Sequence, residues 1–261
     1  MNQYFATIYR YRWLIYELVL RNLRLRYRGS ILGFTWTLAN PLLFMGVYTL
    51  VFSVILKNGM EHFPLYLLAG IVPWTWFASG LAQGATSILD GRLYVGKTLF
   101  PSEVLVVVPV LTNGVNFALS LPFIALVAVA LHVHIGWSLL MLPVVALIEL
   151  ILLQGLATLF ATINVFYRDV NELLSYAITA LMFLTPIFYT QSLVAIHVPQ
   201  IASILALNPL AGIISGFQAI LYGGTMPDLK SLGYSAVVGF VLLAVGQWVF
   251  ERYRESFSEF L

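Results

Sequence analysis

The feature that most constrains this chain is a series of apolar stretches, each long enough to cross a lipid bilayer. A helix needs about 20 mostly apolar residues to span about 30 Å of hydrocarbon. Only 9% of the residues are charged, whereas a soluble domain carries about 25%. We therefore predict an all-α integral membrane protein with six transmembrane helices. The expected spans are residues 33–56, 63–89, 104–131, 137–166, 173–189 and 232–250.

The distribution of Lys and Arg predicts the orientation, because these residues are retained on the cytoplasmic side of membrane proteins. With the N-terminus inside, 11 of the 13 basic residues fall on the cytoplasmic side, and only Lys57 and Lys230 face outward. We therefore expect both termini to be cytoplasmic. The expected inner residues are Arg10, Arg12, Arg21, Arg24, Arg26, Arg28, Arg92, Lys97, Arg168, Arg252 and Arg254.

Residues 200–224 are apolar enough for a seventh span, but Asn208-Pro209, Gly212, Gly216 and Gly223-Gly224 interrupt them. Proline removes a backbone donor and disfavours helix at the residue before it. A seventh span would also reverse the side of the C-terminal Arg residues and weaken the charge bias. We therefore expect two short re-entrant helices on the outer side, which need protein or water around them to satisfy their backbone.

The pattern of residues 8–28 predicts a helix that lies in the cytoplasmic interface of the membrane, with its apolar face in lipid. One interpretation is a topological anchor. The other is that some of its Arg side chains bind an anionic headgroup, because guanidinium matches phosphate bidentately. The apolar wedge holds Tyr11, Leu14, Ile15, Leu18 and Leu25, and the charged wedge beside it holds Arg10, Glu17, Arg21, Arg24 and Arg28.

The loop between the second and third spans, residues 90–103, contains a string from Gly91 to Thr98 that fits the phosphate-loop pattern. A phosphate loop requires a buried strand before it and a nucleotide-binding domain around it, so we do not expect ATP binding here. The loop is instead either a plain connector or an element that transmits movement from a cytoplasmic partner. The next inner loop carries the pair Arg168-Asp169.

Two features inside the spans have both a structural and a functional interpretation. Glu149 is the one carboxylate deep in a span, and such a residue is a functional candidate by default. It is either protonated or hydrogen-bonded to Asn113, Asn116 or Gln83, as structural support or as a substrate contact. Aromatic residues of the first two spans either pack between helices or offer flat faces to sugar rings.

Several short strings, in order along nearly the whole chain, resemble the membrane subunits of polysaccharide-exporting ABC transporters. Arg26-Tyr-Arg-Gly-Ser-Ile-Leu-Gly-Phe-Thr-Trp36 precedes Asn40-Pro41 at the first span. The sequence is most similar to the branch that exports O-antigen polysaccharide or wall teichoic acid on undecaprenyl diphosphate, whereas capsule exporters usually differ at Tyr27-Arg-Gly-Ser30. The other matching strings are Ala69-Gly-Ile-Val-Pro-Trp74, Phe100-Pro101, Phe166-Tyr-Arg-Asp169, Thr185-Pro-Ile-Phe-Tyr189 and Asn208-Pro209.

The resemblance implies a permease that is not itself an enzyme, forms a homodimer and binds two copies of a separate ATPase subunit. Its substrate would be an undecaprenyl-diphosphate-linked glycan, exported across the bacterial inner (plasma) membrane among the membrane lipids. ATP and Mg would bind to the ATPase, so this chain is expected to hold no cofactor and no metal. Nucleic acid is not expected as a partner.

The resemblance and the patterns above give four groups of expected site residues. ATPase coupling is assigned to Arg92, Tyr94, Lys97, Phe100, Pro101, Arg168 and Asp169. Recognition of the lipid-diphosphate headgroup is assigned to Arg24, Arg26, Arg28, Leu32 and Gly33. The glycan channel is assigned to Trp36, Asn40, Phe44, Tyr48, Phe52, Trp74, Trp76 and Phe77. The outer gate, within residues 200–224, is assigned to Asn208 and Pro209.

Three alternatives remain. An ion-coupled secondary transporter or channel predicts internal repeats and midplane ion ligands, for which Glu149 alone is thin support. A membrane-embedded glycosyltransferase requires clustered acids for metal or acid–base chemistry, and the acids here are scattered. A permease for capsule polysaccharide, or for another lipid-linked substrate, would use the same architecture. With no cysteine in the chain, disulfides and thiolate chemistry are excluded.

Overall fold

The computed structural model describes residues 2–27, 36–51, 60–92, 100–133, 136–190, 200, 205 and 207–260. Every regular element within these residues is a helix, which confirms the all-α prediction for the part described. Four of the described segments are long and apolar enough to cross a membrane. They are Phe63–Asp90 (α4), Ser102–Ala130 (α6), Trp137–Phe166 (η3, Trp137–Met141, with α7, Leu142–Phe166) and Leu229–Ser256 (α12, Leu229–Tyr253, with η4, Arg254–Ser256).

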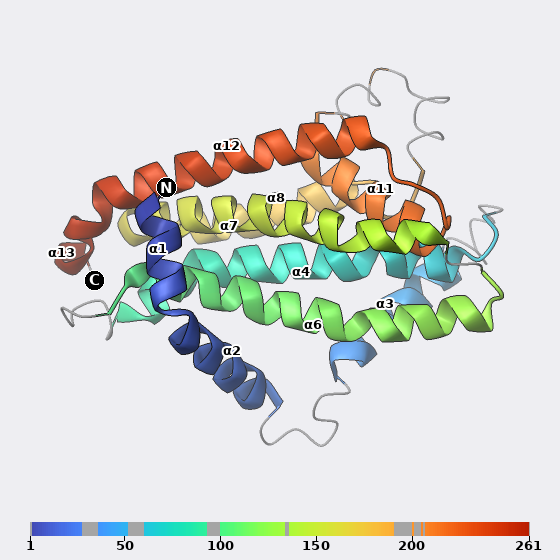
Figure 1. The fold of residues 1–261 in the computed structure, drawn as a ribbon, viewed down its shortest axis with the longest axis horizontal. Helices are drawn as coiled ribbons and strands as arrows, with labels where there is room; N and C mark the ends of the chain where they lie inside the picture. The colour runs from blue at the N-terminus through green and yellow to red at the C-terminus, as the bar shows by residue number, and fades with distance from the viewer. Residues whose placement is uncertain are drawn as a thin grey trace.

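The four long segments lie side by side as one bundle, with both chain termini at the same end (Figure 1). α4, α7 and α12 finish at this end and α6 begins there. We call it the basic end, because Arg10, Arg92, Arg168 and Arg254 lie in helix termini and turns there. The other end of the bundle is called the opposite end.

Glycine lets α7 and α12 pack backbone to backbone. A Cβ atom added to Gly246 of α12 would lie 2.5 Å from the carbonyl oxygen of Gly155 in α7. A Cβ atom on Gly155 would likewise lie 2.5 Å from the backbone nitrogen of Leu243. Small residues allow such close approach in membrane helices, where dispersion forces and not hydrophobic collapse drive association.

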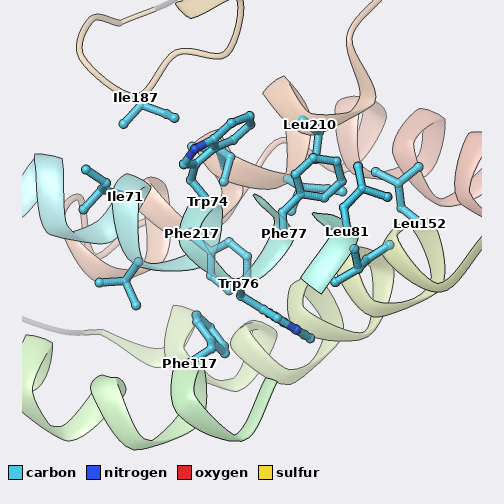
Figure 2. Close-up of a cluster of buried hydrophobic side chains, with 14 of the residues drawn as sticks. Ile71, Trp74, Trp76, Phe77, Leu81, Phe117, Leu152, Ile187, Leu210 and Phe217 are labelled. Carbon is cyan, nitrogen blue, oxygen red and sulfur yellow. The ribbon is translucent and has the colours of Figure 1, made fainter. Parts of the chain in front are cut away.

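The core of the bundle lies between α4, α6, α7 and α11 (Pro209–Leu221), and it is aromatic (Figure 2). The ring of Trp76 stacks on Phe117 with 4.9 Å between centroids, and Phe117 meets Phe217 edge-on at 5.4 Å. The indole Nε1–H of Trp76 donates to the carbonyl oxygen of Val110, at 3.1 Å. A buried indole needs such an acceptor, so Trp76 fixes α4 against α6.

The N-terminal segment forms two helices, α1 (Asn2–Arg10) and α2 (Arg12–Tyr27), with Tyr11 between them. The expectation that its apolar face lies in lipid is wrong for the part nearest the bundle. Ile15 and Val19 are buried against a row of valines in α6, and Leu14 and Leu18 pack beside them. The reason is that the valines of α6 present an apolar strip of their own, which α2 covers. The valines are Val104, Val107 and Val108.

The fifth expected span, residues 173–189, is not one continuous helix. α8 runs from Val170 to Phe183, and residues 184–190 form turns and bends. Pro186 accounts for this difference, because proline lacks an N–H and disfavours helix at the preceding residue. The first expected span is described as α3 (Trp36–Thr49), and the remainder of residues 33–56 lies largely outside the described residues.

In the segment 200–224, α11 begins at Pro209, directly after the predicted break. Gly212 and Gly216 do not interrupt this helix, contrary to expectation; they are points of close contact. A Cβ atom on Gly212 would lie 2.8 Å from the Ser235 hydroxyl oxygen of α12. α11 is buried around most of its circumference, as expected for a helix that is apolar on all sides. Its preceding partner in the expected re-entrant pair lies mostly outside the described residues.

Candidate functional site

A groove at the basic end lies between α2, the end of α4 and the start of α6. It encloses a cavity of about 310 Å³, and we call it the α2–α4–α6 groove. Its polar lining consists of Arg21, Asn22, Gln83, Ser87 and Asp90, and its apolar lining includes Leu18 and Phe100. The groove forms because α2 packs against the valines of α6 with its apolar side, while the charged side of α2 faces the end of α4.

A chain of hydrogen bonds lies beside this groove and joins three helices. Both terminal nitrogens of the Arg26 guanidinium donate to Oδ1 of Asn113, each at 3.4 Å. Nδ2 of Asn113 donates to Oε1 of Gln83 at 3.1 Å and to the carbonyl oxygen of Pro109 at 2.9 Å. The exposed Arg26 of α2 is therefore joined to a buried amide of α6 and, through it, to α4.

Of the five residues expected at the headgroup site, Arg24 and Arg26 are both exposed on α2, and Arg26 bonds to the buried amide of Asn113. Arg28, Leu32 and Gly33 lie outside the described residues. Sequence reasoning did not assign Arg21, Asn22 or Gln83 to this site. Arg21 shares the charged wedge of the N-terminal segment, so helical periodicity could have suggested it.

The residues expected to contact an ATPase lie around two cavities. Arg92, at the end of α4, and Arg168, in the turn between α7 and α8, line one cavity of about 420 Å³ together with Asp90. The segment after α4 and the turn between α7 and α8 therefore meet at one place. Asp169 is exposed beside Arg168, and Tyr94 and Lys97 lie outside the described residues.

Phe100 and Pro101 line the second cavity, also of about 420 Å³, with Arg10, Glu103 and Arg254. Phe100 packs on the apolar cluster that joins α1 and α2 to α6, and it also lines the α2–α4–α6 groove. Near this cavity, burial and the neighbouring Glu103 carboxylate raise the pKa of Tyr4 far above its usual value. The start of α6 is therefore held by both the N-terminal and the C-terminal helices.

The aromatic residues expected along a glycan path separate into two sets. Trp74, Trp76 and Phe77 are buried in the core of the bundle, which agrees with the helix-packing interpretation and not with the channel interpretation for this conformation. Phe44 and Tyr48 of α3 lie at the surface, with ring centroids 6.1 Å apart. The side chains of Trp36 and Asn40, and all of Phe52, lie outside the described residues.

The aromatic contacts continue onto the segment after α8, which sequence reasoning missed. The ring of Tyr48 lies 4.6 Å from that of Phe188, and Phe188 lies 6.0 Å from Phe183. We call the series Phe44, Tyr48, Phe188 and Phe183 the aromatic ladder. Its end members, Phe44 and Phe183, are 51% and 60% exposed, whereas Phe188 between them is buried. The contact between α3 and the turn after α8 has no signal in local sequence.

At the opposite end, Asn208 and the turn after α8 are held by side-chain donors. Nδ2 of Asn208 donates to the carbonyl oxygen of Leu184 and to the Thr185 hydroxyl, while its Oδ1 caps α11 at the Leu210 nitrogen. The carbonyl oxygen of Pro186 accepts from the Tyr66 hydroxyl at 3.3 Å and from Nε2 of Gln218 at 3.0 Å. Pro209, the other expected gate residue, is the first residue of α11.

Glu149 lies in α7 with its side chain fully buried. Neither carboxyl oxygen has a hydrogen-bond partner among the described residues. Two of the partners expected for it, Asn113 and Gln83, bond to each other instead. Within the described residues, no group of three His, Cys, Asp or Glu side chains could hold a metal ion.

These features define a multi-pass helical membrane protein with a polar groove and two charged cavities at one end. Comparison with known proteins narrows this class to one family. Residues 14–222 match the family described as ABC-2 type transporter, and the chain therefore belongs to that family.

Two of the similar proteins are named O-antigen export permeases, and a third is named a polysialic acid transport protein. The chain is 39% identical over 252 residues to the O-antigen export system permease protein RfbA of Myxococcus xanthus, covering 97% of this chain and 96% of that protein. It is 28% identical over 243 residues to the protein of the same name from Klebsiella pneumoniae, covering 92% of each. It is 23% identical over 252 residues to the polysialic acid transport protein KpsM of Escherichia coli, covering 92% and 93%.

Proposed function

We propose that this chain is the membrane subunit of an ATP-driven exporter that moves polysaccharide on undecaprenyl diphosphate across the bacterial inner membrane. The observation that carries the proposal is the 39% identity to an O-antigen export permease along almost the full length of both chains. That relative favours O-antigen over teichoic acid as the glycan. The relative named as a polysialic acid transport protein is only 23% identical, which makes transport of another polysaccharide, such as capsule, the weaker candidate.

In this proposal the basic end faces the cytoplasm, and the chain crosses the membrane six times, with α3 and α8 belonging to the two shorter spans. The charge bias supports this orientation, because Arg residues at the ends of spans stay on the cytoplasmic side. Arg24, Arg26 and Arg28, with the loop residues Leu32 and Gly33, would meet the diphosphate. The bond from Arg26 to Asn113 supports this role, because it holds an exposed guanidinium of α2 beside polar groups of α4 and α6.

The ATPase would be a separate subunit, present in two copies beneath a homodimer of this chain. Its docking surface would be residues 90–103 together with Arg168 and Asp169. The shared cavity of Arg92 and Arg168 supports this assignment, because both inner loops can contact one partner there. Phe100 and Pro101 would transmit the movement, since Phe100 packs on the helices that precede the first span.

The glycan would contact the exposed end members of the aromatic ladder, Phe44 and Phe183, which would face the second subunit. The exposed Tyr176 of α8 supports this arrangement, because it lies two helical turns before Phe183 and so shares a face of the helix with it. Aromatic faces bind the C–H faces of sugars without charge, so a long chain can move without tight binding. Asn208 and Pro209 would belong to the gate at the outer end.

The test is reconstitution of this chain with its ATPase partner in liposomes, followed by measurement of ATP hydrolysis and of lipid-linked glycan export. Phe100→Ala is expected to lower glycan-stimulated hydrolysis and export at least fivefold, because it removes the contact between residues 90–103 and α2. Tyr9→Ala, an exposed aromatic on α1, is the matched control. Monodispersity on gel filtration separates this effect from misfolding, and Phe100→Leu should recover most of the activity. Unchanged export by folded Phe100→Ala would refute the coupling role.

A further inference from the structure

The α2–α4–α6 groove holds one positive and one negative side chain that do not neutralise each other. Arg21 and Asp90 both line it, yet they form no ion pair within the part of the chain that the structure describes. Asp90 accepts one hydrogen bond, from the Thr86 hydroxyl to Oδ2 at 2.8 Å. Both side chains are exposed at the rim of the groove, so the two charges remain available to a ligand.

The groove has a polar side and an apolar side. Asp90 is the last residue of α4, and Ser87 and Gln83 follow it along the same helix toward the middle of the bundle. Seven helical residues correspond to about 10 Å along the helix axis. Leu18, Leu105 and Val108 form the apolar wall beside this path. The groove therefore offers polar groups over about the length of a lipid headgroup, with apolar side chains next to them.

We propose that this groove binds a phospholipid of the surrounding bilayer whose headgroup carries both a phosphate and an ammonium group, as in phosphatidylethanolamine. Arg21 and Asn22 would donate to the phosphate, since guanidinium and amide N–H groups are strong donors to phosphate oxygens. Asp90 would accept from the ammonium group. Leu105 and Val108 would contact the start of one acyl chain.

The charge arrangement selects this headgroup over a purely anionic one. A phosphatidylglycerol or a diphosphate would place negative charge beside the Asp90 carboxylate, which is unfavourable at short range. Arg92 and Arg168 face Asp90 from a neighbouring cavity and do not line the groove, and Arg26 is held by Asn113. The lipid site therefore differs from the Arg26 position proposed for the substrate.

The experiment is lipid analysis of the purified protein, with any subunits that accompany it, by native mass spectrometry in detergent. Partly delipidated protein is titrated with phosphatidylethanolamine, phosphatidylglycerol or undecaprenyl diphosphate. The unaltered protein is expected to retain phosphatidylethanolamine about tenfold better than phosphatidylglycerol, the factor expected from one charge-assisted hydrogen bond. Arg21→Gln should lower the binding of both phospholipids. Asp90→Asn should reverse the preference toward phosphatidylglycerol, a change that loss of folding cannot produce.

Arg12→Gln is the matched control, because Arg12 also lies on α2 but its guanidinium lies over the Tyr9 ring, outside the groove. Its lipid preference should equal that of the unaltered protein. Equal retention of both phospholipids, or a preference that Asp90→Asn leaves unchanged, would overturn the proposal. The proposal would also be overturned if undecaprenyl diphosphate displaced phosphatidylethanolamine in a 1:1 ratio, because the groove would then be the site of the substrate. None of these results depends on whether the protein exports glycan.

Discussion

Glu103, in the first turn of α6, forms an ion pair with Arg254, at the end of α12, with 3.4 Å between Oε1 and the guanidinium nitrogen. The Glu103 side chain is only 11% exposed, so its carboxylate depends on this partner more than a surface acid would. The pair joins the start of α6 to η4, directly after α12.

The ion pair predicts a partial rescue by charge exchange. Arg254→Glu should lower the free energy of unfolding by about 1 kcal/mol, because like charges then face each other at a partly buried site. The exchanged protein, Glu103→Arg with Arg254→Glu, should recover part of this loss but not all of it. An acid in the first turn of a helix is favoured by the helix dipole, and an arginine there is not. Thermal unfolding of the two single variants and of the double variant, analysed as a double-mutant cycle, measures the coupling energy between Glu103 and Arg254. Losses of stability that simply add would contradict the ion pair.

The α7–α12 contact predicts that one added methyl group is costly. Gly246→Ala places a Cβ atom 2.5 Å from the Gly155 carbonyl oxygen, so the two helices must separate. Overpacking of this kind costs about 1–3 kcal/mol, measured as a fall in thermal stability in detergent. Gly233→Ala is the control on the same helix, since nothing lies within 4 Å of its added Cβ atom. It should be neutral or stabilising by up to about 1 kcal/mol, and an equal loss in both variants would refute close packing as the cause.

The buried position of Glu149 predicts that a neutral side chain of equal size is tolerated there. Glu149→Gln should leave thermal stability within about 1 kcal/mol of the unaltered protein, because neither carboxyl oxygen has a partner among the described residues. Glu149→Lys should be strongly destabilising, because it buries an ammonium group with no counter-charge. Export measured with the Gln variant then tests function separately. Loss of export with full stability would assign Glu149 a substrate role.

The capping of α12 predicts a local dependence on pH. Hydrogen bonds from the Ser231 hydroxyl and from the backbone N–H groups of Lys230 and Ser231 lower the pKa of Asp228. A group with a lowered folded-state pKa contributes stability above its unfolded value of about 4, and this contribution is lost as the pH falls through the folded value. Protection of the amides of residues 230 and 231 from hydrogen exchange should therefore fall below about pH 4.

Asp228→Asn is the control for this effect, since asparagine also caps helices but does not titrate. In that variant the added loss of protection below about pH 4 should disappear. Asp228→Ala should lose about 1 kcal/mol of local protection at neutral pH. An unchanged pH profile in the Asn variant would show that another group causes the dependence.

The four long helices could be predicted from the sequence because bilayer thickness alone dictates their apolar length. α4 begins at Phe63 and ends at Asp90, close to the expected 63–89, because Pro64 starts it and charged residues end it. The helix break at Asn208-Pro209 was also predicted correctly, since proline chemistry acts locally.

Features that depend on distant contacts could not be predicted. Arg26 was expected to face headgroups, but nothing in its neighbours indicates Asn113, which lies 87 residues away. Trp76 and Phe77 resemble a sugar-binding pair in sequence, and only their packing against α6 and α11 identifies them as core residues. Gly212 was expected to break the helix, because the sequence does not indicate that Ser235 of α12 packs against it.

The carbonyl oxygen of Pro186 accepts from Tyr66 of α4 and from Gln218 of α11 at once. The Tyr66 hydroxyl has its shorter hydrogen bond, of 2.7 Å, to the carbonyl oxygen of Tyr189, so one side chain of α4 reaches two carbonyl groups of the turn after α8. Gln218 of α11 shares the Pro186 carbonyl and lies within hydrogen-bonding reach of the Tyr66 hydroxyl itself. Displacing the proline turn would therefore disturb hydrogen bonds of both α4 and α11, although the three segments are distant in the chain.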